Sequence, residues 1–222
     1  MPKPVSVKWI RRRLLGWGRE HFRPFSWRAE RDPYRLLVTE VLLKQTTARQ
    51  VASVRTEVLS RYPGAAELAN AEPEELAADI HTLGFSRQRA LGLQQLGSAL
   101  VAMGRVPTTV DALRRLPAVG PYTASAVACF AFGRRQVALD VNVARIIARI
   151  FAIAPKRGEL RKNAEVVRLA SALTQGPSPR EINWALLDLG AEICRPLPRC
   201  PACPLAQQCN YGRQDIVNNR GR

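Results

Sequence analysis

Long apolar runs are absent from the 222-residue sequence, and no apolar stretch reaches the length of a membrane-spanning helix. The N-terminal residues also lack the apolar core of a signal peptide. Acidic residues are scarce: 18 Asp and Glu stand against 34 Lys and Arg, which gives a formal net charge of +16. We therefore expect a soluble, cytoplasmic protein with a polyanionic partner, and we favour DNA or RNA over an anionic membrane surface.

Cysteine is rare outside one short segment. Four of the five cysteines lie within sixteen residues, at Cys194, Cys200, Cys203 and Cys209, whereas Cys129 stands alone in an apolar run and is expected to be a core residue. This usage does not fit a disulfide framework. The spacing C-x5-C-x2-C-x5-C, with no histidine nearby, is typical of a metal centre. A single C-x2-C pair favours a [4Fe–4S] cluster, and tetrahedral zinc is the alternative.

Strand-like alternation and long repeats are also absent. Apolar residues instead recur at spacings of three and four in six segments, and proline or glycine breaks separate these segments. The pattern predicts an all-α fold with roughly ten helices, and a frayed polar end at 214–222. The six helical segments are 34–43, 48–59, 90–101, 124–132, 143–151 and 164–173.

A proline- and glycine-rich turn joins two of these helices at Leu116–Ala124. We expect Gly120 to adopt a backbone conformation that a Cβ atom would oppose, and Pro121 to be the first residue of the next helix. The N-terminus of that helix would then present N–H groups to a phosphate, while Leu116 and Val119 pack the hairpin together. An ordinary corner between two helices is the alternative.

Two carboxyl groups are candidates for chemistry. Asp140 precedes an amphipathic helix, so it is either a helix cap or a carboxylate that stabilises a cation or activates water. In the second case Asn142 would cap the helix and leave Asp140 free. Glu40 lies in an otherwise apolar helix, where it either pairs with Lys44 at i+4 or is a pocket acid with a raised pKa.

The hairpin, an aspartate eighteen residues beyond Tyr122 and the four-cysteine loop together resemble the helix–hairpin–helix base-excision DNA glycosylases of the endonuclease III superfamily. The resemblance runs from about Trp27 to Cys209. It implies two helical lobes: a six-helix barrel with the hairpin at 26–134, and a [4Fe–4S] cluster lobe formed by 1–25 and 135–222. Double-stranded DNA would lie in the cleft between them, with the target nucleotide flipped out. A monomer associated with the nucleoid is expected.

The resemblance also implies roles for individual residues. Asp140 matches the catalytic aspartate, Glu40 and Tyr122 line the pocket, and the four cysteines hold the cluster. Tyr122 stands where lyase-active members have lysine; because tyrosine has no amine to form a Schiff base, the enzyme is expected to be monofunctional. Ala118 replaces a common hairpin glycine. Contacts to DNA are expected from Gln45, Phe85, Leu116, Val119, Gly120, Tyr122, Thr123 and Asn142, with Gln45 and Phe85 filling the hole left by the flipped base.

Two subfamilies are similar to the stretch 39–47: the MIG-type thymine glycosylases and the MutY-type adenine glycosylases. Tyr122 and the absence of paired tyrosines in 83–90 favour the MIG type. The sequence ends 13 residues after Cys209, which leaves no room for the C-terminal domain with which adenine enzymes read 8-oxoguanine. The resemblance thus implies removal of thymine or uracil opposite guanine, with adenine opposite guanine or 8-oxoguanine as the alternative.

Two hypotheses from other classes compete with an enzyme. A non-catalytic DNA-binding module explains the charge and the hairpin but leaves Glu40 in its apolar helix unexplained. A structural metal-binding adaptor explains only the cysteines.

Overall fold

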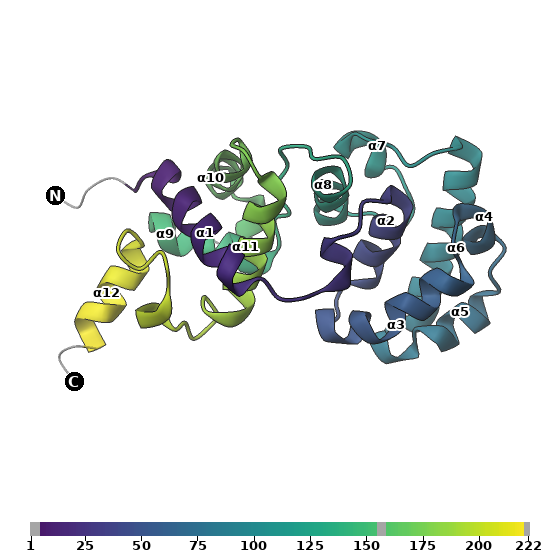
Figure 1. Cartoon of the computed structure of the whole chain (residues 1–222), viewed down its shortest axis with the longest axis horizontal. Coiled ribbons are helices and arrows are strands. Elements are labelled where there is room, and N and C mark those ends of the chain that lie inside the picture. Colours follow the sequence, from purple (N-terminus) through teal and green to yellow (C-terminus); the bar gives the residue numbers. More distant parts are fainter. Residues whose placement is uncertain (1–4, 155–158, 220–222) are drawn as a thin grey trace. The chain divides into compact units, whose positions relative to one another are not determined.

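The computed structural model of the chain describes residues 5–154 and 159–219 (Figure 1). These residues form twelve α-helices and no β-strand, which confirms the all-α class. None of their helices is both long and apolar enough to cross a bilayer. The chain divides into two compact units. Unit 1 consists of Met1–Arg23 and Arg134–Arg222, and unit 2 consists of Pro24–Gly133.

Unit 2 contains seven α-helices where a six-helix barrel was expected, and two of them, α4 and α7, are brief, with five and four residues. Side-chain caps set several of the starts: Asp32 caps α2, Thr109 caps α7, and Thr47 with Gln50 forms a capping box at α3. The helices are α2 (Pro33–Leu42), α3 (Ala48–Arg61), α4 (Ala65–Ala69), α5 (Pro73–Asp79), α6 (Ser86–Met103), α7 (Val110–Leu113) and α8 (Pro121–Phe130).

Helix α2 is buried on every side in unit 2. Every residue from 36 to 42 is buried, as expected for a helix that is apolar all round. α2 packs against α3, α6 and α8, and α6 approaches α4 so closely that a Cβ atom on Gly97 would lie 2.5 Å from the Ala69 nitrogen. This packing places Glu40, in the middle of the buried run, inside the core of unit 2.

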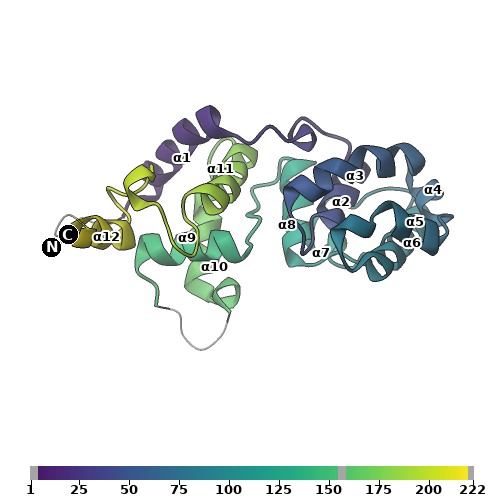
Figure 2. The ribbon, with the colours of Figure 1, turned by 90° about the horizontal axis from the view of Figure 1, so that it is seen from below.

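Unit 1 is built from both ends of the chain. α1 packs along α11, and α9 packs against α10, α11 and α12 (Figure 2). α9 directs Val143, Ile146, Ile147 and Ile150 into the core at the spacing of one helix face. This arrangement holds Asp140 at the start of α9 and the cysteines between α11 and α12. The helices are α1 (Val7–His21), α9 (Val141–Phe151), α10 (Ala164–Thr174), α11 (Pro179–Glu192) and α12 (Asn210–Asn219).

Candidate functional site

Glu40 is the buried carboxyl group of unit 2 that lacks a partner. The residue is 3% exposed, and its Oε2 atom makes no hydrogen bond within the described part of the chain. Burial raises the pKa of Glu40 to about 8. The carboxyl group is therefore protonated at neutral pH, and it can donate a hydrogen bond that an ordinary glutamate cannot.

The expected pairing of Glu40 with Lys44 is not what the structure shows. Lys44 is exposed, and its Nζ atom donates a hydrogen bond of 3.0 Å to the carbonyl oxygen of Ala118 in the hairpin. Lys44 lies beyond the end of α2, where the chain has turned away from the helix register, so an i+4 geometry does not apply. The pairing alternative is therefore wrong, and the raised pKa of Glu40 agrees with the other alternative.

Two other acids with low exposure in the described part of the chain, half-buried Glu30 and buried Asp188, do have partners. Glu30 binds Arg35 and Arg55; burial acts to raise its pKa, but hydrogen bonds from Arg35, the backbone and Arg55 bring the value to about 2. Asp188, fully buried in unit 1, pairs with Arg23. A fold that pairs these two acids but buries Glu40 without a partner carries an energetic cost at Glu40. Such costs are typical of functional sites.

In the hairpin of unit 2, Ala118 and not Gly120 has a left-handed backbone conformation. Gly120 has φ −90° and ψ 178°, which any residue adopts, whereas Ala118 has φ 60° in the left-handed region. The expectation for Gly120 is therefore wrong, and the position where the family commonly has glycine is the one that needs it. A Cβ atom on Gly120 would meet nothing within 4 Å, so the surface beside it is open.

The hairpin presents a helix N-terminus as predicted. Pro121 is the first residue of α8, and no side chain caps that end of the helix. Leu116 and Val119 are buried in the core of unit 2, and Thr123 is 2% exposed. These three side chains therefore hold the hairpin in place, and the backbone at this end of α8 faces outward. Tyr122, in the first turn of α8, is partly buried.

Asp140 caps its own helix, α9. Its Oδ1 atom accepts a hydrogen bond from the Val143 amide at 2.7 Å, and its Oδ2 atom accepts one from Asn142 Nδ2 at 2.8 Å. Of the two alternatives for Asp140, the helix cap is confirmed; Asn142 does not cap α9, because it already lies inside the first turn of the helix. Asp140 is nevertheless partly exposed, and a carboxylate has lone pairs beyond the two in use.

Asn142 and Arg145 link Asp140 to the cysteine loop. Arg145 Nη2 donates to Asn142 Oδ1 at 2.9 Å and to the Cys194 carbonyl oxygen at 2.8 Å. Gly190 makes room for this chain of bonds, because a Cβ atom there would lie 2.8 Å from the Asn142 Cβ. The orientation of the Asp140 carboxylate thus depends on the position of the first cysteine.

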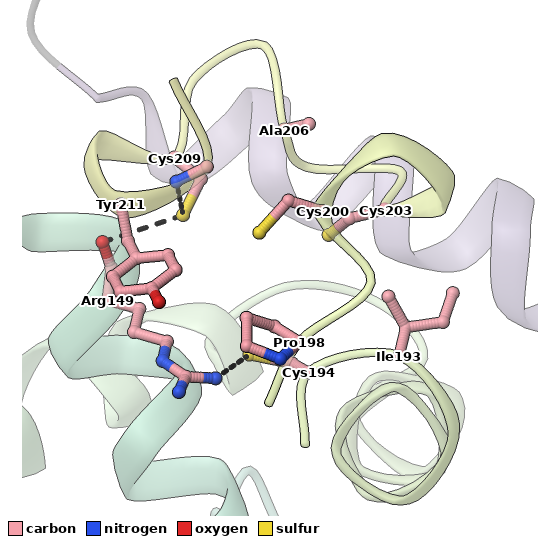
Figure 3. A pocket seen from close by; sticks show the side chains of 10 residues that line it. Arg149, Ile193, Cys194, Pro198, Cys200, Cys203, Ala206, Cys209 and Tyr211 are labelled. Carbon is pink, nitrogen blue, oxygen red and sulfur yellow. Dashed lines mark hydrogen bonds between the residues drawn. The ribbon is translucent and has the colours of Figure 1, made fainter. Parts of the chain in front are cut away.

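The four cysteines of the C-terminal loop border one small cavity (Figure 3). Cys200 and Cys209 are buried, and Cys194 and Cys203 are partly buried. No three Cys, His, Asp or Glu side chains among the described residues are placed to hold a single metal ion.

Three of the four cysteine thiols have a raised pKa. Burial raises the pKa of Cys200 to about 12 and of Cys203 to about 11, and burial also raises the pKa of Cys209. Metal ligation requires thiolates, so binding of a metal centre here releases protons. The cavity and the donor set fit a metal centre, and without one these thiols remain protonated.

Arg149 fastens the loop beside the first cysteine. Its Nη1 atom donates to Cys194 Sγ at 3.4 Å (Figure 3). Nη1 also donates to the carbonyl oxygen of Arg195 at 2.6 Å, and Nη2 donates to that of Pro196 at 2.7 Å. The guanidinium also lies 4.8 Å from the ring centre of Tyr211. Sequence reasoning missed both Arg145 and Arg149; their positions on α9, one helical turn apart, are the signal that was available.

Known DNA glycosylases are similar in sequence to nearly the whole chain. A thymine/uracil-DNA glycosylase of Pyrobaculum aerophilum is 37% identical over 93% of this chain and 92% of its own length. One from Methanothermobacter thermautotrophicus is 36% identical over 89% of this chain and 90% of its own length. The human adenine DNA glycosylase is 34% identical over 92% of this chain, which corresponds to 40% of that protein.

Solved structures of DNA repair enzymes match the fold of nearly the whole chain. The structure of a thermostable thymine-DNA glycosylase matches with a TM-score of 0.85 and 33% identity, over 94% of this chain and 97% of that one. A non-covalent endonuclease III–DNA complex matches with a TM-score of 0.80 and 26% identity, over 96% and 100%. The family model of the HhH-GPD superfamily base excision DNA repair protein matches residues 38–169. The chain therefore belongs to the HhH-GPD superfamily of base excision DNA repair proteins.

Proposed function

We propose that this protein is a monofunctional DNA glycosylase that removes thymine or uracil opposite guanine from double-stranded DNA. The observation that carries the proposal is Glu40, a buried, unpartnered carboxyl group whose pKa of about 8 keeps it protonated at neutral pH. The relatives named thymine/uracil-DNA glycosylase support the base preference, since they match nearly the full length of the chain.

DNA binding rests on charge and on the hairpin. The net charge of +16 attracts the phosphate backbone, and the uncapped N-terminus of α8 beside the open surface at Gly120 suits a phosphate. Gln45 and Phe85 fill the space of the flipped nucleotide. Asn142 and the main chain at Thr123, whose side chain is buried, also contact the DNA. The endonuclease III structure in complex with DNA supports this mode of binding.

The chemical step breaks the bond between C1′ of the sugar and N1 of the pyrimidine. The bonding electrons leave with the base, where the protonated Glu40 and the Tyr122 hydroxyl donate hydrogen bonds that stabilise the developing negative charge. The Asp140 carboxylate stabilises the positive charge that develops on the sugar, orients the water that attacks C1′ and accepts the proton that this water loses; the departing base takes up a proton from solvent. Asn142 and Arg145 keep the Asp140 carboxylate in place.

The same residues account for an expected lack of strand cleavage. Tyr122 has no amine, so it cannot form the Schiff base on which β-elimination depends. Lys44 is the nearby lysine in the sequence, but its amine donates to the Ala118 carbonyl oxygen. The product is therefore an abasic site in an intact strand.

Cys194, Cys200, Cys203 and Cys209 would hold a [4Fe–4S] cluster. When bound, the cluster joins the segments on either side of the loop covalently and so supplies structural stability. Through the Arg145 contact to the Cys194 carbonyl oxygen, the loop then fixes the position of Asn142 and hence of Asp140.

Base release from a set of duplexes tests the proposal. Purified protein is incubated with duplexes containing T:G, U:G, A:G or A:8-oxoguanine, and abasic sites are revealed by alkali. Release from T:G and U:G alone supports the proposal. Release of adenine would assign the chain to the alternative that the adenine glycosylases represent, and binding without release from any duplex would leave a DNA-binding module.

A further inference from the structure

Two turns of unit 2 carry exposed side chains on backbone that side-chain-bearing residues rarely adopt. Gln45 has φ 51° and Phe85 has φ 49°, both in the left-handed region, and Phe85 is 68% exposed. This conformation is unfavourable for L-residues, so neighbouring structure has to hold it. We call the segments 43–46 and 84–85 the wedge turns, because under the proposed function they carry the two side chains that replace the flipped nucleotide.

One buried guanidinium serves the backbone next to both wedge turns. Arg89 is 8% exposed and occupies a core position of α6. Its Nη1 atom donates to the carbonyl oxygens of Val41 at 2.9 Å and Leu42 at 3.3 Å, and its Nη2 atom donates to those of Gly84 at 3.3 Å and Leu83 at 3.5 Å. One pair ends α2 just before the first wedge turn, and the other pair immediately precedes Phe85.

A second link lies at the surface, between residues that flank the two wedge turns. Gln50, at the start of α3, donates from Nε2 to the carbonyl oxygen of Thr82 at 2.8 Å. Its Oε1 atom accepts from the Thr47 amide at 3.2 Å as part of the capping box. The two wedge turns are therefore joined once in the core and once at the surface.

Burial of an arginine is costly unless its donors have acceptors. The described contacts of Arg89 include no carboxylate, and its Nε atom is buried without an acceptor. The two Nη atoms of the guanidinium instead donate to four carbonyl oxygens from two separate segments. A residue that only filled the core would not need this charge. Holding the two segments in register is the role that explains it.

We propose that Arg89, assisted by Gln50, is a positioning residue that fixes the wedge turns relative to each other, so that Gln45 and Phe85 enter the base stack together. The inference rests on the proposed function. Without the link the two turns move independently, and the flipped state loses its support while phosphate binding persists.

Two substitutions separate this role from folding. Arg89→Lys keeps the charge but replaces the fork by one ammonium that cannot face all four carbonyl oxygens. Gln50→Glu keeps the oxygen acceptor of the capping box and removes the donor to Thr82. Arg105→Lys, at an exposed arginine beyond α6, and Gln88→Glu, on the exposed face of α6, are matched controls for side-chain chemistry and charge.

The readout is base flipping in a duplex that cannot be cleaved. A 2-aminopurine placed beside a 2′-fluoro-thymidine opposite guanine brightens when the thymidine leaves the stack. Relative to wild type, Arg89→Lys should reduce this rise in fluorescence. With a cleavable T:G duplex, the same variant should slow single-turnover release of thymine by about 10- to 100-fold, the effect of a misplacement of about 1 Å. Gln50→Glu should slow release by about 3-fold or more, because one of the two links remains. The Kd for a fully matched duplex should stay within about 2-fold for Arg89→Lys.

Wild-type flipping and release in Arg89→Lys would overturn the inference, and so would a lowered Tm with unchanged flipping by the folded protein. If Arg89→Lys does not fold, Gln50→Glu decides: reduced flipping relative to Gln88→Glu supports the inference, and equal flipping refutes it. A failure of the proposed function has a different signature, because wild-type protein would then release no base from T:G or U:G.

Discussion

Replacing Glu40 with glutamine preserves the size of the side chain and removes its ionisation. In the folded protein the pKa of Glu40 is about 8, whereas its ordinary value is 4.5. Between these values the folded state holds one proton more than the unfolded state, so the free energy of unfolding of wild type falls as pH rises through this window. Below about pH 4.5 Glu40 is protonated in both states, and the wild type keeps its full stability in this respect. The stability falls as the pH rises above 4.5, and the loss is complete at about pH 8.

The slope is about 1.4 kcal/mol per pH unit for one proton. Glu40→Gln has no such slope, so from pH 5 to pH 8 its stability relative to wild type should increase by about 4 kcal/mol. Urea titrations of both proteins at the two pH values measure the difference, in which the other titrating groups cancel. Glu57→Gln, at an exposed position, is the matched control and should show no such increase.

The same variant should lose function while gaining stability. Because the glutamine amide is a weaker hydrogen-bond donor than the carboxyl group, release of thymine should slow by up to about 10²-fold with DNA binding retained, and wild-type release should decline above about pH 8. A stability difference between Glu40→Gln and wild type that is the same at pH 5 and pH 8 would refute the reasoning, since the carboxyl group would then titrate as it does in water.

Three further predictions concern the remaining parts of the site. Asp140→Asn should bind a T:G duplex with wild-type affinity and release thymine about 10³-fold more slowly in single-turnover assays; near-normal turnover would remove Asp140 from the mechanism. Borohydride should trap no covalent adduct with a T:G duplex, because Tyr122 has no amine; efficient trapping would contradict the monofunctional assignment. The purified protein should absorb visible light through thiolate-to-iron charge transfer, and Cys203→Ser should lose that absorbance and lower the Tm; a colourless wild-type protein containing zinc would exclude the cluster.

Much of the fold followed from local patterns. The segment predicted at 48–59 is α3 (Ala48–Arg61), and the one at 143–151 lies within α9 (Val141–Phe151). The start of α8 at Pro121 was predicted because a proline's missing N–H costs nothing in a first helical turn. Each of these features depends on residues only a few positions apart, which is why the sequence sufficed.

The C-terminal helix shows where local reasoning fails. The polar stretch from 214 was expected to fray, but α12 extends to Asn219 and the prediction is wrong for 214–219; residues 220–222 lie outside the described residues. Distant contacts hold this helix: Asn210 donates to the Ile150 carbonyl oxygen, and Arg149 lies over the ring of Tyr211. The local hydropathy pattern does not predict either contact.

The sequence by itself determined the helical class, the hairpin, the four-cysteine set and the two candidate carboxyl groups, because periodicity, turn chemistry and ligand spacing are written in neighbouring residues. Only the tertiary structure decided what those groups can do. It buried Glu40 without a partner, turned Lys44 toward Ala118, and brought carbonyl oxygens from two separate turns to Arg89. Burial and long-range hydrogen bonds depend on which distant segments meet, and that information exists only once the chain has packed.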